Sequence, residues 1–378
     1  MNRKHFLQLS GSAAAGVALG VAIDHERPTK GTVPFYGEHQ AGIATPAQDR
    51  LVFAAYDVVG TRRELQQVLE EWTDAAVKMT KGDPVGEVEG SPLAPPADTG
   101  EALDLPASKL TLTFGYGETL FDSRFRLGSK RPALLTPIGA LPGDELDPLS
   151  SGGDLCVQAC ATDPQVAFHA VRNLLRIGRG VVELRWLQLG FGRTSTTDSS
   201  QSTPRNLHGF KDGINNLRGD DRNAMNQFVW VSDDPQPWMN GGTYLVSRRI
   251  RMFIETWDRS SLQDQEQTVG RTKRTGDVLP GAPANAHIRL ASPKANNAEA
   301  ILRRGYSYTD GIDYRTGQLD AGLFFICFQR DPHNQFAAIQ RRLSRDALHE
   351  YVQHTSSALF AIPRGLSPGQ PLGDGLFS

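Results

Sequence analysis

Four short apolar runs occur along the chain, and each is followed by a stretch whose hydrophobic residues recur at helical spacing. After the first run, Leu65, Val68, Leu69 and Trp72 would share one face of a helix. An apolar run of this length, followed by a period near 3.6 residues, is typical of a buried strand that leads into an amphipathic helix. The pattern predicts four strand–helix units, whose strands include residues 49–56, 154–161, 242–247 and 323–329.

The second and fourth units share a weak similarity that suggests an internal duplication. In both, an Asp-Pro pair follows the strand, as Asp163-Pro164 and as Asp331-Pro332. Aspartate can cap a helix and proline tolerates the first helical position, so a helix is expected to begin at each pair. The predicted helices then run through Val166, Phe168, Val171, Leu174 and Leu175, and through Phe336, Ile339 and Leu343.

Paired strand–helix–strand units with long irregular insertions predict the α+β fold class, built from two ferredoxin-like halves. We place the N-terminal half at residues 45–219 and the C-terminal half at residues 220–365. Three stretches that are rich in Gly, Pro or small polar residues are expected to be surface loops, and the C-terminal tail is expected to be loose. The loops are residues 86–100, 142–153 and 194–202, and the tail is residues 366–378.

The first 22 residues have the composition of an export signal. A basic start containing Arg3 and Lys4 precedes a short apolar stretch and small residues that suit cleavage. The order Arg-Lys-x-Phe-Leu resembles a twin-arginine signal in which lysine replaces one arginine. The alternatives are a disordered N-terminus and an uncleaved anchor, although the apolar run is short for a membrane span. We therefore expect an exported protein of the periplasm or the extracellular space.

Composition excludes two classes of protein. The formal net charge is -2 and both signs are spread along the chain, which argues against a nucleic-acid-binding protein. Three cysteines are too few for a disulfide scaffold. Cys156 and Cys160 lie four residues apart on a predicted strand, roughly 13 Å, which is too far for a disulfide. All three cysteines are therefore predicted to be small core residues.

One motif carries most of the chemical information. Residues 208–216 read His-Gly-Phe-Lys-Asp-Gly-Ile-Asn-Asn, and they hold Asp212 between two glycines. Glycine permits a tight turn and a close approach to a ligand, so this carboxylate is placed for chemistry. Alone, the motif is better explained as an ordinary solvated Asp-Gly turn, because Asp-Gly is among the commonest turn dipeptides. It is followed by His287 in Ala-His-Ile-Arg-Leu-Ala and by Arg303 in Ile-Leu-Arg-Arg-Gly.

Asp, His and Arg in this order and these contexts resemble the dye-decolorising peroxidases, a family of haem enzymes with a Gly-x-x-Asp-Gly motif. Residues 209–213 match that motif. The chain is most similar to the secreted branch that includes the deferrochelatase/peroxidase proteins of bacterial iron uptake, through residues 33–43, 322–330 and 339–343. The resemblance extends from Val33 to Pro363. It implies two ferredoxin-like halves with facing antiparallel sheets and one haem b in the C-terminal half.

The resemblance also implies roles for individual residues. His287 would be the proximal ligand of the haem iron, and Glu350 would be the acid that accepts its other N–H. Asp212 would move the proton during peroxide cleavage, and Arg303 would stabilise the separating charge. Arg304, the second arginine of the pair, is expected at the surface. The other residues expected to contact haem are Gly213, Ile214, Asn215, Ser292, Pro293, Lys294, Leu323 and Phe325, with Lys294 or Arg289 pairing with a propionate.

The implied reaction is the reduction of hydrogen peroxide by a small one-electron donor. Bulky dyes would reduce a buried haem only through surface aromatic residues. The motifs leave two alternatives open: a deferrochelatase that removes iron from intact haem, and a haem carrier without turnover. An iron-uptake permease and a second copy of the chain remain open as partners. Most of the candidate aromatics are expected to be core residues, and the sequence does not rank them. They are Trp186, Trp230, Trp238, Trp257, Tyr306 and Tyr308.

Overall fold

The computed structural model describes residues 31–377, so the predicted export signal at residues 1–22 lies outside the described part of the chain. The first half of this part contains four strands and two long helices. Their bounds are β1 Arg50–Val58, α1 Arg62–Lys81, β2 Thr111–Gly117, β3 Leu155–Ala161, α2 Pro164–Ile177 and β4 Val182–Arg193.

The second half contains the remaining strands and a series of short helices. The strands are β5 Thr243–Met252, β6 Leu302–Arg303, β7 Tyr306–Asp313, β8 Gln318–Gln329 and β9 Val352–Ile362. The α-helices are α3 Arg222–Phe228, α4 Ile254–Arg259, α5 Leu262–Val269, α6 His287–Leu290 and α7 Ala338–Arg342. Single helical turns at Pro332–Ala337 and Ala347–Tyr351 flank α7 and precede β9.

Eight strands form a closed antiparallel ring. The order is β5-β9-β2-β3-β1-β4-β7-β8, and β8 pairs back with β5, while the two-residue strand β6 pairs with the C-terminal end of β8. The halves are joined by two short pairings, β2 with β9 and β4 with β7. The predicted α+β class with antiparallel strands is confirmed, but hydrogen bonds connect the two expected sheets into one barrel-like ring.

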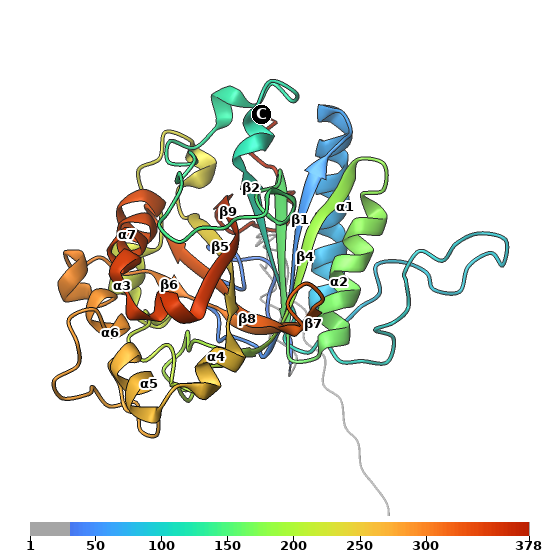
Figure 1. The fold of residues 1–378 in the computed structure, drawn as a ribbon. Helices are drawn as coiled ribbons and strands as arrows, with labels where there is room; N and C mark the ends of the chain where they lie inside the picture. Colours follow the sequence, from blue (N-terminus) through green and yellow to red (C-terminus); the bar gives the residue numbers. More distant parts are fainter. Residues whose placement is uncertain (1–30, 378) are drawn as a thin grey trace, which may run out of the picture.

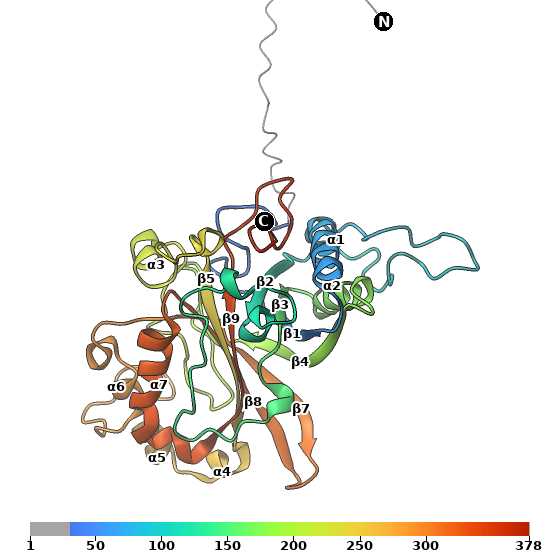
Figure 2. The same ribbon diagram turned by 90° about the horizontal axis from the view of Figure 1, so that it is seen from above.

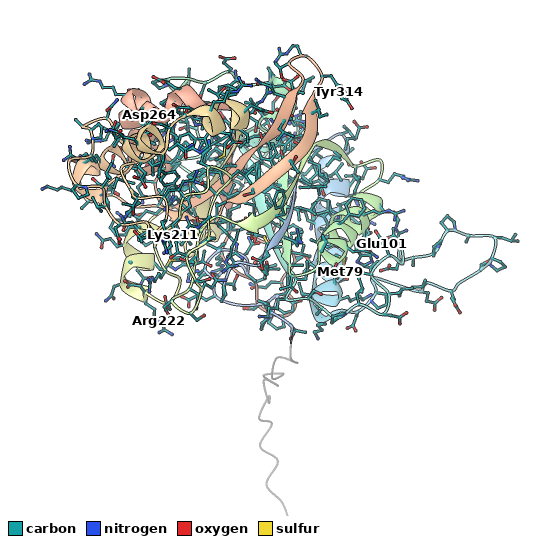
Figure 3. All side chains as sticks on the ribbon, turned by 60° about the horizontal axis from the view of Figure 1, so that its bottom comes forward. Met79, Glu101, Lys211, Arg222, Asp264 and Tyr314 are labelled. Atoms are coloured by element: carbon teal, nitrogen blue, oxygen red, sulfur yellow. The ribbon has the colours of Figure 1, made fainter. Side chains whose placement is uncertain are left out.

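The helices of the two halves cover different parts of this ring. Helices α1 and α2 lie side by side along the strands of the first half, whereas α3 to α7 form a separate lobe beside β5, β8 and β9 (Figures 1 and 2). The loop between α1 and β2 projects away from the body in both views. Met79 and Glu101 lie on the side of the molecule that carries α1 and α2, and Lys211 and Asp264 lie on the side of the helical lobe (Figure 3). No helix of residues 31–377 is long and apolar enough to cross a membrane.

Capping residues begin and end α1 and begin α2. Thr61 and Glu64 form a reciprocal capping box at the start of α1, and Gly82 ends the helix in a left-handed conformation. Asp163 accepts hydrogen bonds from the first backbone N–H groups of α2. The buried Trp72 then ties the helices together, because its indole N–H donates to the carbonyl of Leu174 at 2.8 Å.

The interior of the ring is filled by aromatic and small side chains, including Phe53, Phe324 and Phe360. Cys156 and Cys160 belong to this core, and Cys327 belongs to a smaller cluster, so the prediction of unpaired core cysteines is confirmed. The six aromatic residues considered as surface electron donors are all core residues, as was expected for most of them. Trp186, Trp230, Trp238, Trp257, Tyr306 and Tyr308 are each buried.

Two segments, the tail that was expected to be loose and a stretch that was expected to be a surface loop, are packed against the core. The tail buries Leu372 and Leu376 against the first-half core, and the backbone N–H of Leu372 donates to Thr73 at 2.8 Å. The polar segment at residues 194–202 is only partly a surface loop, because all four of its first residues are buried. These two corrections share a cause: local composition does not record a tertiary partner that satisfies the backbone. The four buried residues are Thr194, Ser195, Thr196 and Thr197.

Candidate functional site

A large cavity lies between the helical lobe, residues 206–215 and the outer face of β5, β8 and β9. It contains about 1650 Å³ of space free of protein atoms, part of it open to solvent. Its walls are mostly apolar, with a small number of polar side chains. Such a combination is typical of a cofactor or substrate site. The apolar walls include Ile250, Met252, Leu323, Phe325, Phe336, Ile339 and Leu343.

Asp212 reaches the cavity from a turn that needs its two glycines. Gly209 and Gly213 have φ values of 82° and 77°, a left-handed conformation that favours glycine. A Cβ on Gly213 would also lie 2.9 Å from the Cα of Ser195. The carboxylate of Asp212 accepts hydrogen bonds from the Asn206 amide at 3.1 Å and from the backbone N–H of Gly213 at 2.7 Å. The motif therefore holds a fixed carboxylate at the cavity wall.

Arg303 completes a pair with Asp212 across 91 residues of sequence. Its guanidinium donates to the Asp212 carboxylate at 2.9 Å, and both side chains remain partly exposed to the cavity. Arg303 lies on β6, which pairs with β8 at Cys327. The neighbouring Arg304 was expected at the surface, but it is fully buried and donates to backbone carbonyls of Ile43 and Thr45 and to Gln48.

His287 lies at the first position of α6 and lines the same cavity. Its Nδ1 lies 2.5 Å from a carboxylate oxygen of Asp346, whose side chain is 4% exposed. Burial alone would lower the pKa of the His287 imidazole, but the charge and hydrogen bond of Asp346 raise it above the ordinary value. The bond to Nδ1 leaves Nε2 for a ligand in the cavity.

The prediction that Glu350 would be the acid beside His287 is wrong. Glu350 is exposed and does not line the cavity, whereas Asp346 begins the helical turn Ala347–Tyr351 and caps it through the N–H of Leu348 at 2.9 Å. Asp346 thus has both carboxylate oxygens in use. A residue at the start of a turn is held by its cap, while a residue within an exposed turn can point to solvent.

Most of the other predicted contact residues line the cavity, and two candidates do not. Lys294 lies on an exposed turn away from the cavity lining, and Arg289 is also absent from it. The structure therefore gives no support to either residue as a propionate partner. The predicted residues that do line the cavity are Gly213, Ile214, Asn215, Ser292, Pro293, Leu323 and Phe325.

Several polar residues of the cavity were not predicted from the sequence. Arg248 is almost fully buried and forms an ion pair with Asp144. Arg271 also lines the cavity, where burial and the nearby charge of Arg303 lower its pKa. His208 stacks on Trp257 with ring centroids 4.3 Å apart, and burial lowers its pKa to about 4. Of these three, only His208 had a sequence signal: its position before the Asp212 motif had already made it a candidate to face the cofactor.

Comparison with known proteins finds family matches along nearly the whole described chain. Residues 40–192 match the family described as Dyp-type peroxidase, N-terminal, and residues 203–367 match Dyp-type peroxidase, C-terminal. This chain belongs to the Dyp-type peroxidase family. The family assignment confirms the resemblance that the Asp212, His287 and Arg303 contexts indicated.

Individual relatives cover most of this Dyp-type peroxidase chain. A curated deferrochelatase of Escherichia coli O157:H7 is 35% identical over 368 residues, which is 91% of this chain and 86% of the relative. An oxyferrous complex of DtpA from Streptomyces lividans is 37% identical with a TM-score of 0.83, covering 92% and 98% of the two chains. A DyP-type peroxidase from Streptomyces coelicolor is 36% identical with a TM-score of 0.81, covering 91% and 97%.

Proposed function

We propose that the protein binds one haem b in this cavity and uses it to reduce hydrogen peroxide at the expense of a small one-electron donor. The observation that carries the proposal is the Asp212–Arg303 pair in a cavity that also presents His287. A protein that only carried haem would need the imidazole and the apolar walls, but it would not need a carboxylate and a guanidinium held 2.9 Å apart.

The cavity residues fit a haem. No group of three or more His, Cys, Asp or Glu residues that could hold a bare metal ion occurs within residues 31–377. His287 is a single imidazole donor, which would suit an iron that receives its four other nitrogen ligands from a porphyrin. Its hydrogen bond to Asp346 fixes the ring and makes it a stronger donor. The apolar walls fit the faces of the macrocycle. Arg271 and Lys211 line the cavity without an ion pair among the described residues, and both are candidates to pair with a propionate.

When bound, the haem would supply the two electrons that split the O–O bond of peroxide, one from its iron and one from its porphyrin, and the reducing substrate would return them one at a time. Asp212 takes the proton from one peroxide oxygen and delivers it to the other, which leaves as water. Arg303 stabilises the negative charge on the departing oxygen. Asn206 and the Gly213 N–H hold the carboxylate in place during both transfers.

The test uses protein reconstituted with haem and three variants. His287→Ala should change the Soret spectrum because the axial imidazole is lost. Asp212→Asn and Arg303→Leu should keep a spectrum of the histidine-ligated protein but lose peroxide-dependent oxidation of a small donor. A wild-type protein that binds no haem, or an Asp212→Asn variant of full activity, would refute the proposal.

A second candidate function is deferrochelatase activity, because the curated relatives that match this chain at 35–36% identity carry that name. The protein would then release iron from haem and leave the porphyrin intact. Incubation with haem in the absence of peroxide separates the two functions. Accumulation of metal-free protoporphyrin, measured by its fluorescence, supports the second function, whereas recovery of intact haem supports the peroxidase alone.

We further propose that the chain consists of two ferredoxin-like halves, with haem in the second. The order β2-β3-β1-β4 of the first half and the order β8-β5-β9 with β7 beside β8 in the second support this reading. We also propose export to the periplasm or the extracellular space by residues 1–22, which subcellular fractionation with and without that segment would test. An iron-uptake permease and a second copy of the chain remain candidate partners.

A further inference from the structure

We infer that Asn216 is a positioning residue, which fixes Arg303 relative to Asp212; this inference rests on the proposed peroxidase function. The side-chain amide of Asn216 donates to the backbone carbonyl of Arg303 at 2.8 Å, and its oxygen accepts the backbone N–H of Arg303, also at 2.8 Å. One side chain thus imitates the hydrogen bonding of a neighbouring strand.

The same amide reaches a third segment. It donates a second hydrogen bond to the carbonyl of Thr196 at 2.8 Å. The Asp212 turn already packs on this segment, since Gly213 has no room for a Cβ beside Ser195. Asn216 therefore joins the turn that carries Asp212, the strand that carries Arg303 and the buried segment between them, with both donors and its acceptor in use.

The need for such a connection follows from the strand that carries Arg303. Strand β6 consists of two residues and pairs with β8 on one side only. Regular strand pairing therefore leaves the other backbone edge of Arg303 without a neighbour, and Asn216 occupies that edge. The distance of 2.9 Å between the guanidinium and the Asp212 carboxylate then depends on a register that Asn216 sets.

Arg304 holds the buried segment at residues 194–197 from the side away from Asn216. Its buried guanidinium donates to the carbonyl of Thr45, which also accepts the hydroxyl of Thr197 at 2.8 Å. This arrangement fixes the segment that Asn216 contacts through Thr196. Asn216 makes no contact with the cavity space itself, because it does not line the cavity. Its effect on the reaction must pass through Arg303 and Asp212.

The test measures fluoride binding to the ferric, haem-loaded protein, because a correctly placed Arg303 stabilises a small anion in the cavity. Asn216→Ala should weaken fluoride binding roughly tenfold, the effect of losing one charge-assisted hydrogen bond. The same substitution in an Arg303→Leu background should change fluoride affinity less than about twofold, since coupled residues are not additive.

Asn173→Ala is the matched control. Asn173 is fully buried in the first half and also uses two donors and one acceptor, with Thr99 and the carbonyl of His169. It should lose thermal stability as Asn216→Ala does, yet keep wild-type fluoride affinity. If Asn216→Ala does not fold, Asn216→Asp, which keeps the acceptor for the Arg303 N–H and loses both donors, should show the weakened binding.

Two outcomes would overturn the inference: unchanged fluoride affinity in both Asn216 variants, or an equal loss in the wild-type and Arg303→Leu backgrounds. A wild-type protein that binds no haem would instead refute the proposed function. The two failures are distinguished by the wild-type spectrum before fluoride is added.

Discussion

The contact between Asp346 and His287 yields the sharpest prediction, because it replaces the partner that the sequence suggested. We consider Asp346→Asn, which keeps the size of the side chain and removes its charge. Asp346 is buried, bonds to Nδ1 of His287 at 2.5 Å and accepts the N–H of Leu348. The substitution should leave the helical turn in place and weaken the bond to the imidazole.

The magnitude follows from the type of hydrogen bond. Hydrogen bonds to charged groups contribute about 1.5–3 kcal/mol, against about 0.5–1.5 kcal/mol for neutral pairs. Loss of the charge alone should therefore cost about 1–1.5 kcal/mol, which corresponds to roughly a tenfold loss of haem affinity. The carboxylate also favours ferric over ferrous iron. If the substitution destabilises the ferric form relative to the ferrous form by the same energy, the midpoint potential rises by about 60 mV, because the couple transfers one electron.

The assay is a spectroelectrochemical titration of the haem-loaded wild type, Asp346→Asn and Glu350→Gln. Only Asp346→Asn should have a raised midpoint potential, since Glu350 is exposed and remote from the cavity lining. A raised potential in Glu350→Gln, with none in Asp346→Asn, would show that the hydrogen bond to His287 does not control the iron. The haem content of each variant, measured in parallel, separates a change of potential from loss of cofactor.

Three further predictions concern the cavity, the pH dependence and the tail. Arg303→Leu should lower kcat/KM for peroxide by about 10²–10³, the usual effect of removing a charge-stabilising donor, whereas Asn173→Ala should not; steady-state kinetics would measure both. Burial, with secondary contributions from nearby positive groups, lowers the pKa of His354 to about 3. The unfolded chain therefore binds an additional proton as the pH falls below about 6.5, and stability should decrease from there toward pH 3. At pH 5 the loss should be about 2 kcal/mol in urea unfolding of the haem-free protein, and a His354→Gln variant should show a flatter profile. Truncation after residue 370 should destabilise the protein by about 3–6 kcal/mol, because Leu372 and Leu376 are buried, and a truncated protein as stable as the full chain would contradict the packing described for the tail.

The sequence predicts those parts of the molecule that depend on neighbours in the chain. Helix α2 begins at its Asp-Pro pair because capping involves residues two or three positions apart. The Asp212 turn needs glycines within its own five residues. Strand β9 was missed for the opposite reason. Its buried positions include the polar residues His354 and Ser356, and a register irregularity lies between them, so the alternation that marks a strand is hidden.

The difference between local signals and tertiary packing also explains which residues of the site could be predicted. Asp212, His287 and Arg303 have recognisable local contexts, and the structure brings all three to one cavity. The acid beside His287 has no such context, because Asp346 and Glu350 are two similar carboxylates four residues apart. The choice between them depends on which one is held by a helical cap and faces α6, and this is a property of the packed structure.

The three parts of the site are carried by a turn, a four-residue helix and a two-residue strand, none of which can fix a geometry alone. The closed ring and its core supply stability to the molecule, but they do not set distances of a few tenths of an ångström in such short segments. Side chains that bond to backbone, such as Asn216 and Asp346, perform that task. Because each of them contributes only about 1–3 kcal/mol, their loss should change the chemistry of the cavity before it unfolds the protein.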